Sequence, residues 1–264
     1  MKIVWCSDVH LNFVSRLDIP DLVRDFESKG DIVIYTGDID DGRGIRRSLE
    51  SIGNGEKPAY YILGNHDYYH SSWAYIDAMC KNERFKAISV ENVGPIKLTD
   101  STVMVGVGGW VDGRAGNFLR SNVVISDHTE ITELLGFRCN SKEILSRVRG
   151  RADRHQEILR VQIDSALEMK PKYVLVLSHA PIFVETNLSP DRKKSDNDWL
   201  PHFSWTGPRK MMIEYAEKNP EVKFVCLAGH THSWAHAVIR SNLTALVAGA
   251  RYRDPKVYDV LEVD

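Results

Sequence analysis

Residues 59–67 of the chain read AYYILGNHD, an apolar run followed directly by a polar turn. The first five residues are apolar and end at a glycine, which is typical of a buried strand. The last four, Gly64-Asn65-His66-Asp67, offer a flexible backbone, a neutral oxygen ligand, a proton donor and a carboxylate. A tetrapeptide of this kind also occurs in ordinary turns, so its meaning depends on what else the chain places at strand ends.

Four further polar clusters also follow apolar, strand-like runs. Ligands of open α/β sheets bind beyond the carboxyl ends of the strands, so the clusters are expected to supply one shared site. Asp8 and His10 stand at i and i+2 of an extended segment, which predicts that their side chains project to the same side. Taken singly, each cluster is also consistent with a polar turn. The four are Asp8-Val9-His10 after residues 3–7, Gly37-Asp38 after 31–36, His179 after 172–177, and Gly229-His230-Thr231-His232 after 222–228.

Helices alternate with strands along the chain. Strands alternating with helices, and then followed by further strands, predict an α/β fold with layers around central sheets. In the longest helix, Gly150 is a candidate for a break. Helices are predicted over residues 19–28, 45–52, 71–81, 141–170 and 207–218, and further strands near residue 88 and over 93–98, 102–107, 234–239, 243–248 and 257–263.

Two stretches lack periodicity. Residues 111–140 are polar with scattered apolar side chains, and residues 185–206 form a long loop. Loops of this length are often lids or binding loops, so both are interpreted as insertion or lid segments of a single domain spanning residues 1–264. In the second stretch, Trp199 and Trp205 could stack on a base or pack the loop.

Composition is that of an ordinary globular protein, with 43% hydrophobic and 27% charged residues. The formal net charge of −2 does not favour a protein that coats nucleic acid or a membrane surface. Apolar runs stay well short of the roughly 20 residues that span a bilayer, and the N-terminus has the pattern of a first strand rather than a signal peptide. The four cysteines show no paired spacing, so a reducing, cytoplasmic location is expected.

The pooled side chains are oxygen and imidazole donors, which suit Mn, Fe, Zn, Ni or Co rather than Mg or Ca alone. Seven donors are too many for one tetrahedral ion and suit two metals that share a bridging carboxylate. A lone histidine near a strand end is more often structural than ligating, but five of the ten histidines fall in these clusters. The pattern therefore favours ligands over an entirely structural set. The seven donors are Asp8, His10, Asp38, Asn65, His179, His230 and His232.

Along residues 8–232, the clusters read in order Asp-x-His, Gly-Asp-x-x-Asp, Gly-Asn-His-Asp, His and Gly-His-x-His. This series resembles the calcineurin-like metallophosphoesterase family. The resemblance implies a four-layer α/β/β/α sandwich with two packed mixed β-sheets and a dinuclear metal site at one end. It further implies that Asp8, His10 and His232 hold one metal, that Asn65, His179 and His230 hold the other, and that Asp38 bridges them.

His66 is not a metal ligand in the family that the chain resembles. The resemblance implies that His66 faces the leaving group, where an imidazole with a pKa near neutrality can act as a general acid. Asp67 is then expected to orient the ring of His66, with capping of the turn as the alternative.

Two positions depart from related phosphatases. Protein Ser/Thr phosphatases usually carry Glu at the position of Asp67, and Arg directly after the position of Asp41, where this chain has Gly42. Purple acid phosphatases carry Tyr at the position of Asp41. These departures disfavour a protein phosphatase and a tyrosinate–iron centre.

Together these features predict a dinuclear metal-dependent phosphoesterase that acts by in-line attack of a metal-bridging hydroxide. The cofactors are expected to be two divalent ions, with Mn favoured over Fe, Zn, Ni or Co. Gly-Asn-His-Asp is frequent in relatives that resemble phosphodiesterases, so a small-molecule phosphodiester is the favoured substrate, with nucleotides among the candidates. A phosphomonoesterase is the alternative, and the charge balance disfavours a nuclease.

A non-catalytic metal-binding module on the same fold is the alternative from another class. Some relatives that resemble membrane-trafficking subunits have lost ligands or the catalytic histidine. Every such position is filled in this chain, which favours the enzyme.

Overall fold

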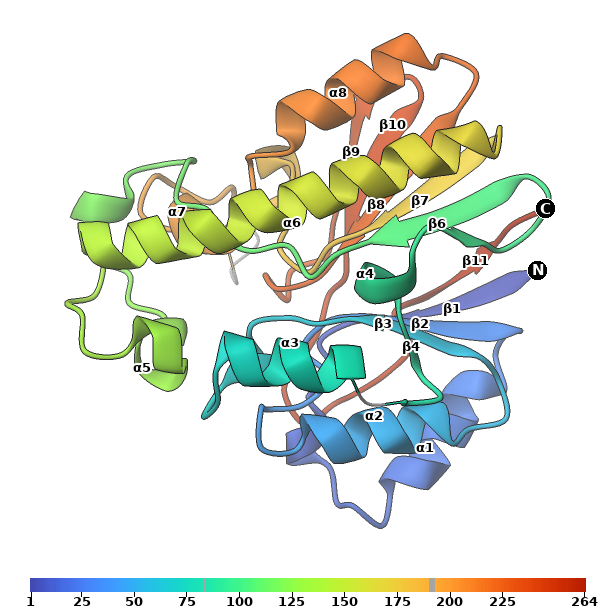
Figure 1. Cartoon of the computed structure of the whole chain (residues 1–264), viewed down its shortest axis with the longest axis horizontal. Helices are drawn as coiled ribbons and strands as arrows, with labels where there is room; N and C mark the ends of the chain where they lie inside the picture. Colours follow the sequence, from blue (N-terminus) through green and yellow to red (C-terminus); the bar gives the residue numbers. More distant parts are fainter. Residues whose placement is uncertain (83, 190–192) are drawn as a thin grey trace.

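The computed structural model describes residues 1–82, 84–189 and 193–264. Residues 83 and 190–192 lie outside the described ranges, and the latter three belong to the predicted segment 185–206. Two β-sheets form the centre of the molecule, with the strand orders β11-β1-β2-β3-β4 and β5-β6-β7-β8-β10-β9. Figure 1 shows the two sheets between an upper and a lower group of helices.

The first sheet is built from the N-terminal strands and closed by the last one. Strands β1 to β4 run parallel to one another, and β11 pairs antiparallel with β1. The sheet is therefore mixed, as predicted. Its strands are β1 (Lys2–Cys6), β2 (Ile32–Thr36), β3 (Ala59–Ile62), β4 (Ile88–Ser89) and β11 (Asp259–Glu262).

The second sheet is also mixed. Strands β6, β7, β8 and β10 run parallel, while β5 and β9 pair antiparallel at the two edges. The sequence predicted each of these strands, with boundaries that differ by one to three residues. They are β5 (Ile96–Lys97), β6 (Thr102–Gly106), β7 (Tyr173–Leu177), β8 (Lys223–Ala228), β9 (Ala235–Arg240) and β10 (Leu243–Val247).

Helices cover the outer faces of both sheets, which confirms the predicted four layers. Helices α1 (Ile19–Glu27), α2 (Ile45–Gly53) and α3 (Trp73–Asn82) lie on the side of the first sheet, and α6 (Lys142–Glu168) and α8 (Arg209–Lys218) on the side of the second (Figure 1). The shorter helical turns are α4 (Val90–Val93), α5 (Asp127–Glu130), α7 (Leu200–Phe203), and the 3-10 turns η1 (Leu11–Phe13), η2 (His66–Tyr68), η3 (Phe118–Arg120), η4 (Thr132–Leu134) and η5 (Val184–Thr186).

Alternate residues of each central strand pack into different layers. In β1, Ile3 and Trp5 join a buried cluster with Leu175 of β7, and this cluster fills the space between the sheets. Val4 and Cys6 belong to the second, larger cluster, which contains the buried faces of the outer helices. Each fully buried Ile or Leu contributes about 1.5–3 kcal/mol, which is why these strands are apolar on both faces.

Helix α6 is continuous, so the predicted break at Gly150 is wrong. A Cβ atom added at this position would meet nothing within 4 Å, so the glycine lies on an open helix face. Glycine there costs about 1 kcal/mol relative to alanine, which the packing of the buried stripe outweighs. Ser141 caps the helix by accepting a hydrogen bond from the backbone N–H of Ile144, at 3.3 Å.

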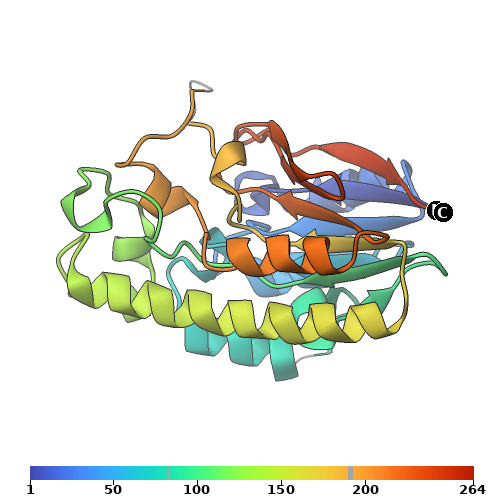
Figure 2. The ribbon, with the colours of Figure 1, turned by 90° about the horizontal axis from the view of Figure 1, so that it is seen from above.

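The two chain termini lie together at one end of the sandwich, as Figure 2 shows. The N-terminal amine donates a hydrogen bond of 2.7 Å to the carbonyl of Val263. Residues 111–140 and helix α7 lie toward the opposite end, beyond the carboxyl ends of the parallel strands (Figures 1 and 2). Among the described residues, no helix is both long enough and apolar enough to cross a membrane.

Candidate metal centre

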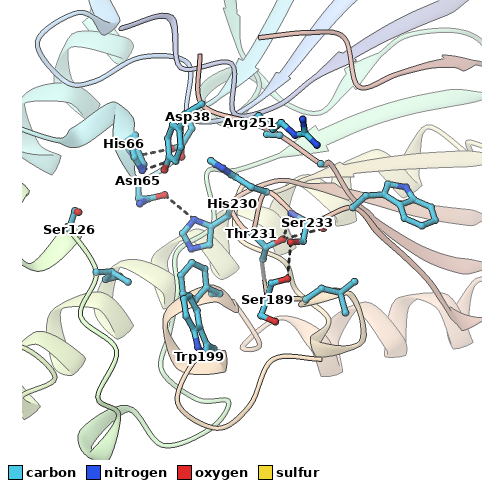
Figure 3. Close-up of a pocket in the computed structure, with 18 of the residues that line it drawn as sticks. Asp38, Asn65, His66, Ser126, Ser189, Trp199, His230, Thr231, Ser233 and Arg251 are labelled. Atoms are coloured by element: carbon cyan, nitrogen blue, oxygen red, sulfur yellow. Dashed lines mark hydrogen bonds and ion pairs between the residues drawn. The ribbon is translucent and has the colours of Figure 1, made fainter. Parts of the chain in front are cut away.

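The loops after five parallel strands meet at one edge of the sandwich and bring all seven predicted donors together. Figure 3 shows Asp38, Asn65 and His230 entering one pocket from different loops. The donors are Asp8 and His10 after β1, Asp38 after β2, Asn65 after β3, His179 after β7, and His230 and His232 after β8.

The first group of donors consists of Asp8, His10, Asp38 and His232. One donor atom from each side chain lies within 4.8 Å of all the others. The Nε2 atoms of His10 and His232 are 3.2 Å apart, and Nε2 of His232 lies 3.3 Å from Oδ1 of Asp8. Two carboxylates and two imidazoles that converge in this way fit a divalent transition-metal ion.

The second group is centred on the side-chain oxygen of Asn65. This Oδ1 atom lies 3.1 Å from Nε2 of His179 and 3.0 Å from Nδ1 of His230. Asp38 faces both groups, because its Oδ1 is 3.3 Å from His179 and its Oδ2 is 4.0 Å from His10. This placement is what a carboxylate shared by two ions requires.

Backbone carbonyls fix which ring nitrogen of two histidines points at the site. Nδ1 of His179 lies 2.9 Å from the carbonyl of Thr36, and Nε2 of His230 lies 3.1 Å from the carbonyl of His202. A carbonyl can only accept, so these nitrogens carry the hydrogens and the opposite nitrogens present lone pairs to the second group. The residues present therefore fit a metal at this position.

The local backbone differs from the extended segment expected around Asp8 and His10. Both residues are left-handed, with φ of 52° and 44°, so the expectation that an extended i, i+2 spacing aligns them is wrong. Such conformations cost non-glycine residues about 1–3 kcal/mol each and persist only where the surroundings enforce them. Here the N–H groups of Asp8 and His10 donate to the carbonyls of Gly37 and Asp38. Asp38, His230 and His232 share the left-handed conformation, with φ of 51°, 69° and 55°.

Burial and neighbouring charges give Asp38, His10 and His230 the protonation states that metal binding requires. Burial disfavours the charge on Asp38, but His179 and His66 outweigh burial and hold the pKa of this carboxyl well below its usual range. Burial lowers the pKa of His10 to about 4 and that of His230 to about 4. At neutral pH the carboxylate is thus ionised and these two imidazoles are neutral, as metal ligands must be. For His179, burial is outweighed by the charge of Asp38, which raises the pKa to about 10, so a metal at this ring must displace a proton.

His66 and Asp67 lie beside the donors. Nε2 of His66 is 3.9 Å from Oδ2 of Asp38, and its partly exposed ring packs on the ring of Tyr69. The buried carboxylate of Asp67 accepts 2.8 Å hydrogen bonds from the backbone N–H groups of Gly64 and Asp40. In the described part of the chain, no hydrogen bond joins Asp67 to the ring of His66. The geometry of Asp67 therefore supports bracing of the loops after β2 and β3.

A cleft of about 980 Å³ opens onto the donors and contains residues that the sequence did not single out. Asp127 of the segment 111–140 accepts a 2.8 Å hydrogen bond from Nδ2 of Asn65. Trp199 lines this cleft, whereas Trp205 is fully buried and packs the loop. Tyr252 also lines it, and no motif marks either Asp127 or Tyr252 in the sequence.

Solved structures of similar fold cover almost the whole chain. A phosphopantetheinyl hydrolase from Mycobacterium tuberculosis has a TM-score of 0.60 at 15% identity, over 97% of this chain and 94% of that one. A dimetal phosphatase from Danio rerio has a TM-score of 0.56 at 13% identity, over 94% of this chain and 87% of that one. At this identity the likeness is one of fold. No curated protein sequence matches the chain.

The family model described as calcineurin-like phosphoesterase matches residues 1–234, which include every strand-end cluster. The chain therefore belongs to the calcineurin-like phosphoesterase family and is a metal-dependent phosphoric ester hydrolase.

Proposed function

We propose that the protein is a dinuclear phosphodiesterase that acts on small-molecule esters. Asp8, His10 and His232 would hold one divalent ion and Asn65, His179 and His230 the other, with Asp38 shared. When bound, two such ions supply a hydrolytic nucleophile and stabilise the charge that develops on phosphorus. We favour Mn for both ions, because oxygen and imidazole donors suit it.

The preference for a diester rests on aromatic side chains at both sides of the donors. The Tyr252 ring lies 4.6 Å from that of His10 and 4.8 Å from that of His232. On the other side, the Phe203 ring lies 5.1 Å from that of His230. A diester carries an organic group on each side of phosphorus, and each group would have an apolar surface to contact.

His66 would protonate the leaving oxygen. Its side chain is 21% exposed and lines the cleft, whereas that of His10 beside it is fully buried. A general acid needs this access to substrate, and an imidazole is a side chain that can donate a proton to a leaving oxygen.

A phosphomonoesterase is the second candidate, and the observation that favours it is the presence of Arg251 and Lys256 in the cleft lining. Cationic side chains suit the dianion of a monoester. Two flexible cations in a wide cleft with aromatic borders support a monoester less than the paired aromatic surfaces support a diester.

Purified protein loaded with Mn should be compared on bis-p-nitrophenyl phosphate and p-nitrophenyl phosphate. We expect kcat/KM for the diester to be at least tenfold higher. Phe203→Ala and Tyr252→Ala should lower diester turnover more than monoester turnover. A reversed preference in the native protein would establish the phosphomonoesterase, and inertness toward both esters and a nucleotide panel would support a non-catalytic module.

A further inference from the structure

The side-chain amide of Asn65 can serve as a ligand in only one of its two orientations. Its oxygen can bind a cation, whereas its NH2 group is a donor with no lone pair to offer. In the structure, Oδ1 points to His179 and His230 while Nδ2 points away from them. Something must hold the amide in this orientation, because the two ends have nearly the same shape.

Two side chains accept hydrogen bonds from the NH2 group of Asn65. Nδ2 donates a 2.8 Å hydrogen bond to Oδ1 of Asp127 and a 3.0 Å hydrogen bond to the hydroxyl oxygen of Tyr69. An ionised carboxylate only accepts, so Asp127 favours the nitrogen of the amide over its oxygen. With both amide hydrogens used on this side, the oxygen is left facing the histidines of the second group.

Asp127 is built into the site from a distant part of the chain. It lies in α5, within the segment 111–140, and is only 1% exposed. Its Oδ1 also accepts a 2.7 Å hydrogen bond from the hydroxyl of Tyr69, whereas its Oδ2 is buried without a partner among the described residues. Burying a carboxylate costs free energy unless hydrogen bonds compensate for the lost water. The burial of Asp127 next to Asn65 therefore indicates a role at the cleft.

Tyr69 connects the same carboxylate to the proposed acid. The Tyr69 ring lies 4.2 Å from the ring of His66. Burial, and then the negative charge of Asp127, raise the pKa of Tyr69 well above its usual range, so its hydroxyl remains a donor. Asp127 thereby holds both the amide of Asn65 and the ring on which His66 packs.

We propose that Asp127 is a positioning residue that directs the oxygen of Asn65 toward the second metal. The proposal rests on the proposed function, in which Asn65 is a ligand of that metal. The segment 111–140 is then a part of the metal centre rather than a lid alone. Outer groups that orient ligands typically change metal affinity by about 10–100-fold.

The test measures metal binding directly, by titration with Mn and by metal content after dialysis. Asp127→Ala should bind the first ion normally and the second about 10–100-fold more weakly, with kcat restored at saturating Mn. Asp127→Asn keeps an acceptor for Nδ2 and should recover most of the lost affinity. Binding of both ions by Asp127→Ala with native affinity would overturn the proposal.

Asp112→Ala is the matched control. Asp112 is a buried carboxylate of the same segment, but it accepts from the backbone of Arg114 and Gly207 and contacts none of the donors. The Asp112→Ala variant should bind both ions like the native protein. If it loses as much affinity for the second ion as Asp127→Ala does, the effect of Asp127→Ala would come from loosening of the segment, which would contradict the proposal.

If Asp127→Ala does not fold, Asp127→Leu decides, because it keeps a side chain of similar size but offers no acceptor to Nδ2 of Asn65. We expect the second ion to bind about 10–100-fold more weakly, whereas unchanged affinity would overturn the proposal. Native protein that binds two ions but hydrolyses no ester would contradict the proposed function, while the comparison of affinities would still test Asp127.

Discussion

Nε2 of His66 lies 3.9 Å from Oδ2 of Asp38, the carboxylate that faces both groups of donors. His66 therefore lies beside the proposed metal centre without being one of the converging donors. General acids contribute about 10²–10⁴-fold to turnover. We expect His66→Ala to lower kcat by that factor on a diester with an alkyl leaving group, and far less on a p-nitrophenyl ester, whose leaving group needs no proton.

Metal content distinguishes this role from ligation. His66→Ala should retain as much Mn as the native protein. His70→Ala is the control, because His70 is exposed and paired with Glu130 at 2.7 Å. Equal losses of turnover with both leaving groups would argue that His66 does not act as an acid.

Asp67→Asn should destabilise the protein. The two carboxylate oxygens of Asp67 accept from the backbone N–H groups of Gly64 and Asp40, and asparagine can accept from only one of them. Leaving a buried donor unsatisfied costs about 1–3 kcal/mol, measurable by urea denaturation. If Asp67 acts only by bracing the loops, its effect on kcat should persist in a His66→Ala background. If kcat of the double variant equals that of His66→Ala alone, Asp67 works through the ring of His66, as the sequence predicted.

The donors were predictable because each follows a strand within a few residues. Asp38 and Asn65 need no knowledge of distant contacts, since parallel strands bring their ends to one edge. The left-handed backbone of Asp8 and His10 was not predictable in the same way, because it depends on bonds to the next loop. The continuity of α6 at Gly150 likewise follows from tertiary packing, which overrides local propensity.

The residues that complete the cleft were not predictable. Asp127 reaches Asn65 across a sequence separation of 62 residues, from a segment without periodicity. Tyr252 lies in the loop that connects β10 of the second sheet with β11 of the first sheet. This loop passes from one sheet to the other at the edge where the donors lie, and the Tyr252 ring contacts that of His10 there. Neither position has a local pattern that distinguishes it from solvent-exposed polar or aromatic residues.

Gly229→Ala should disrupt the first group of donors. A Cβ atom at Gly229 would overlap Oδ2 of Asp8 and the hydroxyl of Ser7 that donates to it. Because this crowding pushes the carboxylate from its place, we expect Mn affinity of the first ion to fall at least tenfold, by about 1.4 kcal/mol or more.

Gly150→Ala is the contrasting substitution. Its added Cβ meets open space on α6, and alanine there should raise the free energy of unfolding by about 0.5–1 kcal/mol while Mn binding stays unchanged. Unaltered Mn affinity in Gly229→Ala would show that the loop yields without displacing Asp8.

Arg151 should be among the largest single contributors to stability outside the metal centre. It is 5% exposed, binds Asp77 through two hydrogen bonds of 2.9 and 3.0 Å, and lies over the rings of Trp73 and Trp110. Arg151→Ala removes the hydrogen bonds to Asp77 and the contacts with the two rings, and because the Asp77 side chain is 38% exposed, it should cost about 1–3 kcal/mol. Arg151→Lys should recover little, because an ammonium cannot reproduce the paired bonds or the stacking.

The contribution of this ion pair should depend on pH in a defined direction. Burial raises the pKa of Asp77, but the hydrogen bonds and charge of Arg151 outweigh burial, and the net pKa is lowered. A carboxyl whose pKa is lower in the folded state stabilises the fold above its unfolded pKa of about 3.9 and loses that effect as pH falls through the folded value. The difference in unfolding free energy between native protein and Asp77→Asn should therefore be constant from about pH 6 to 5 and shrink below about pH 4. A difference that persists unchanged to pH 2 would show that shape, rather than charge, makes Asp77 stabilising.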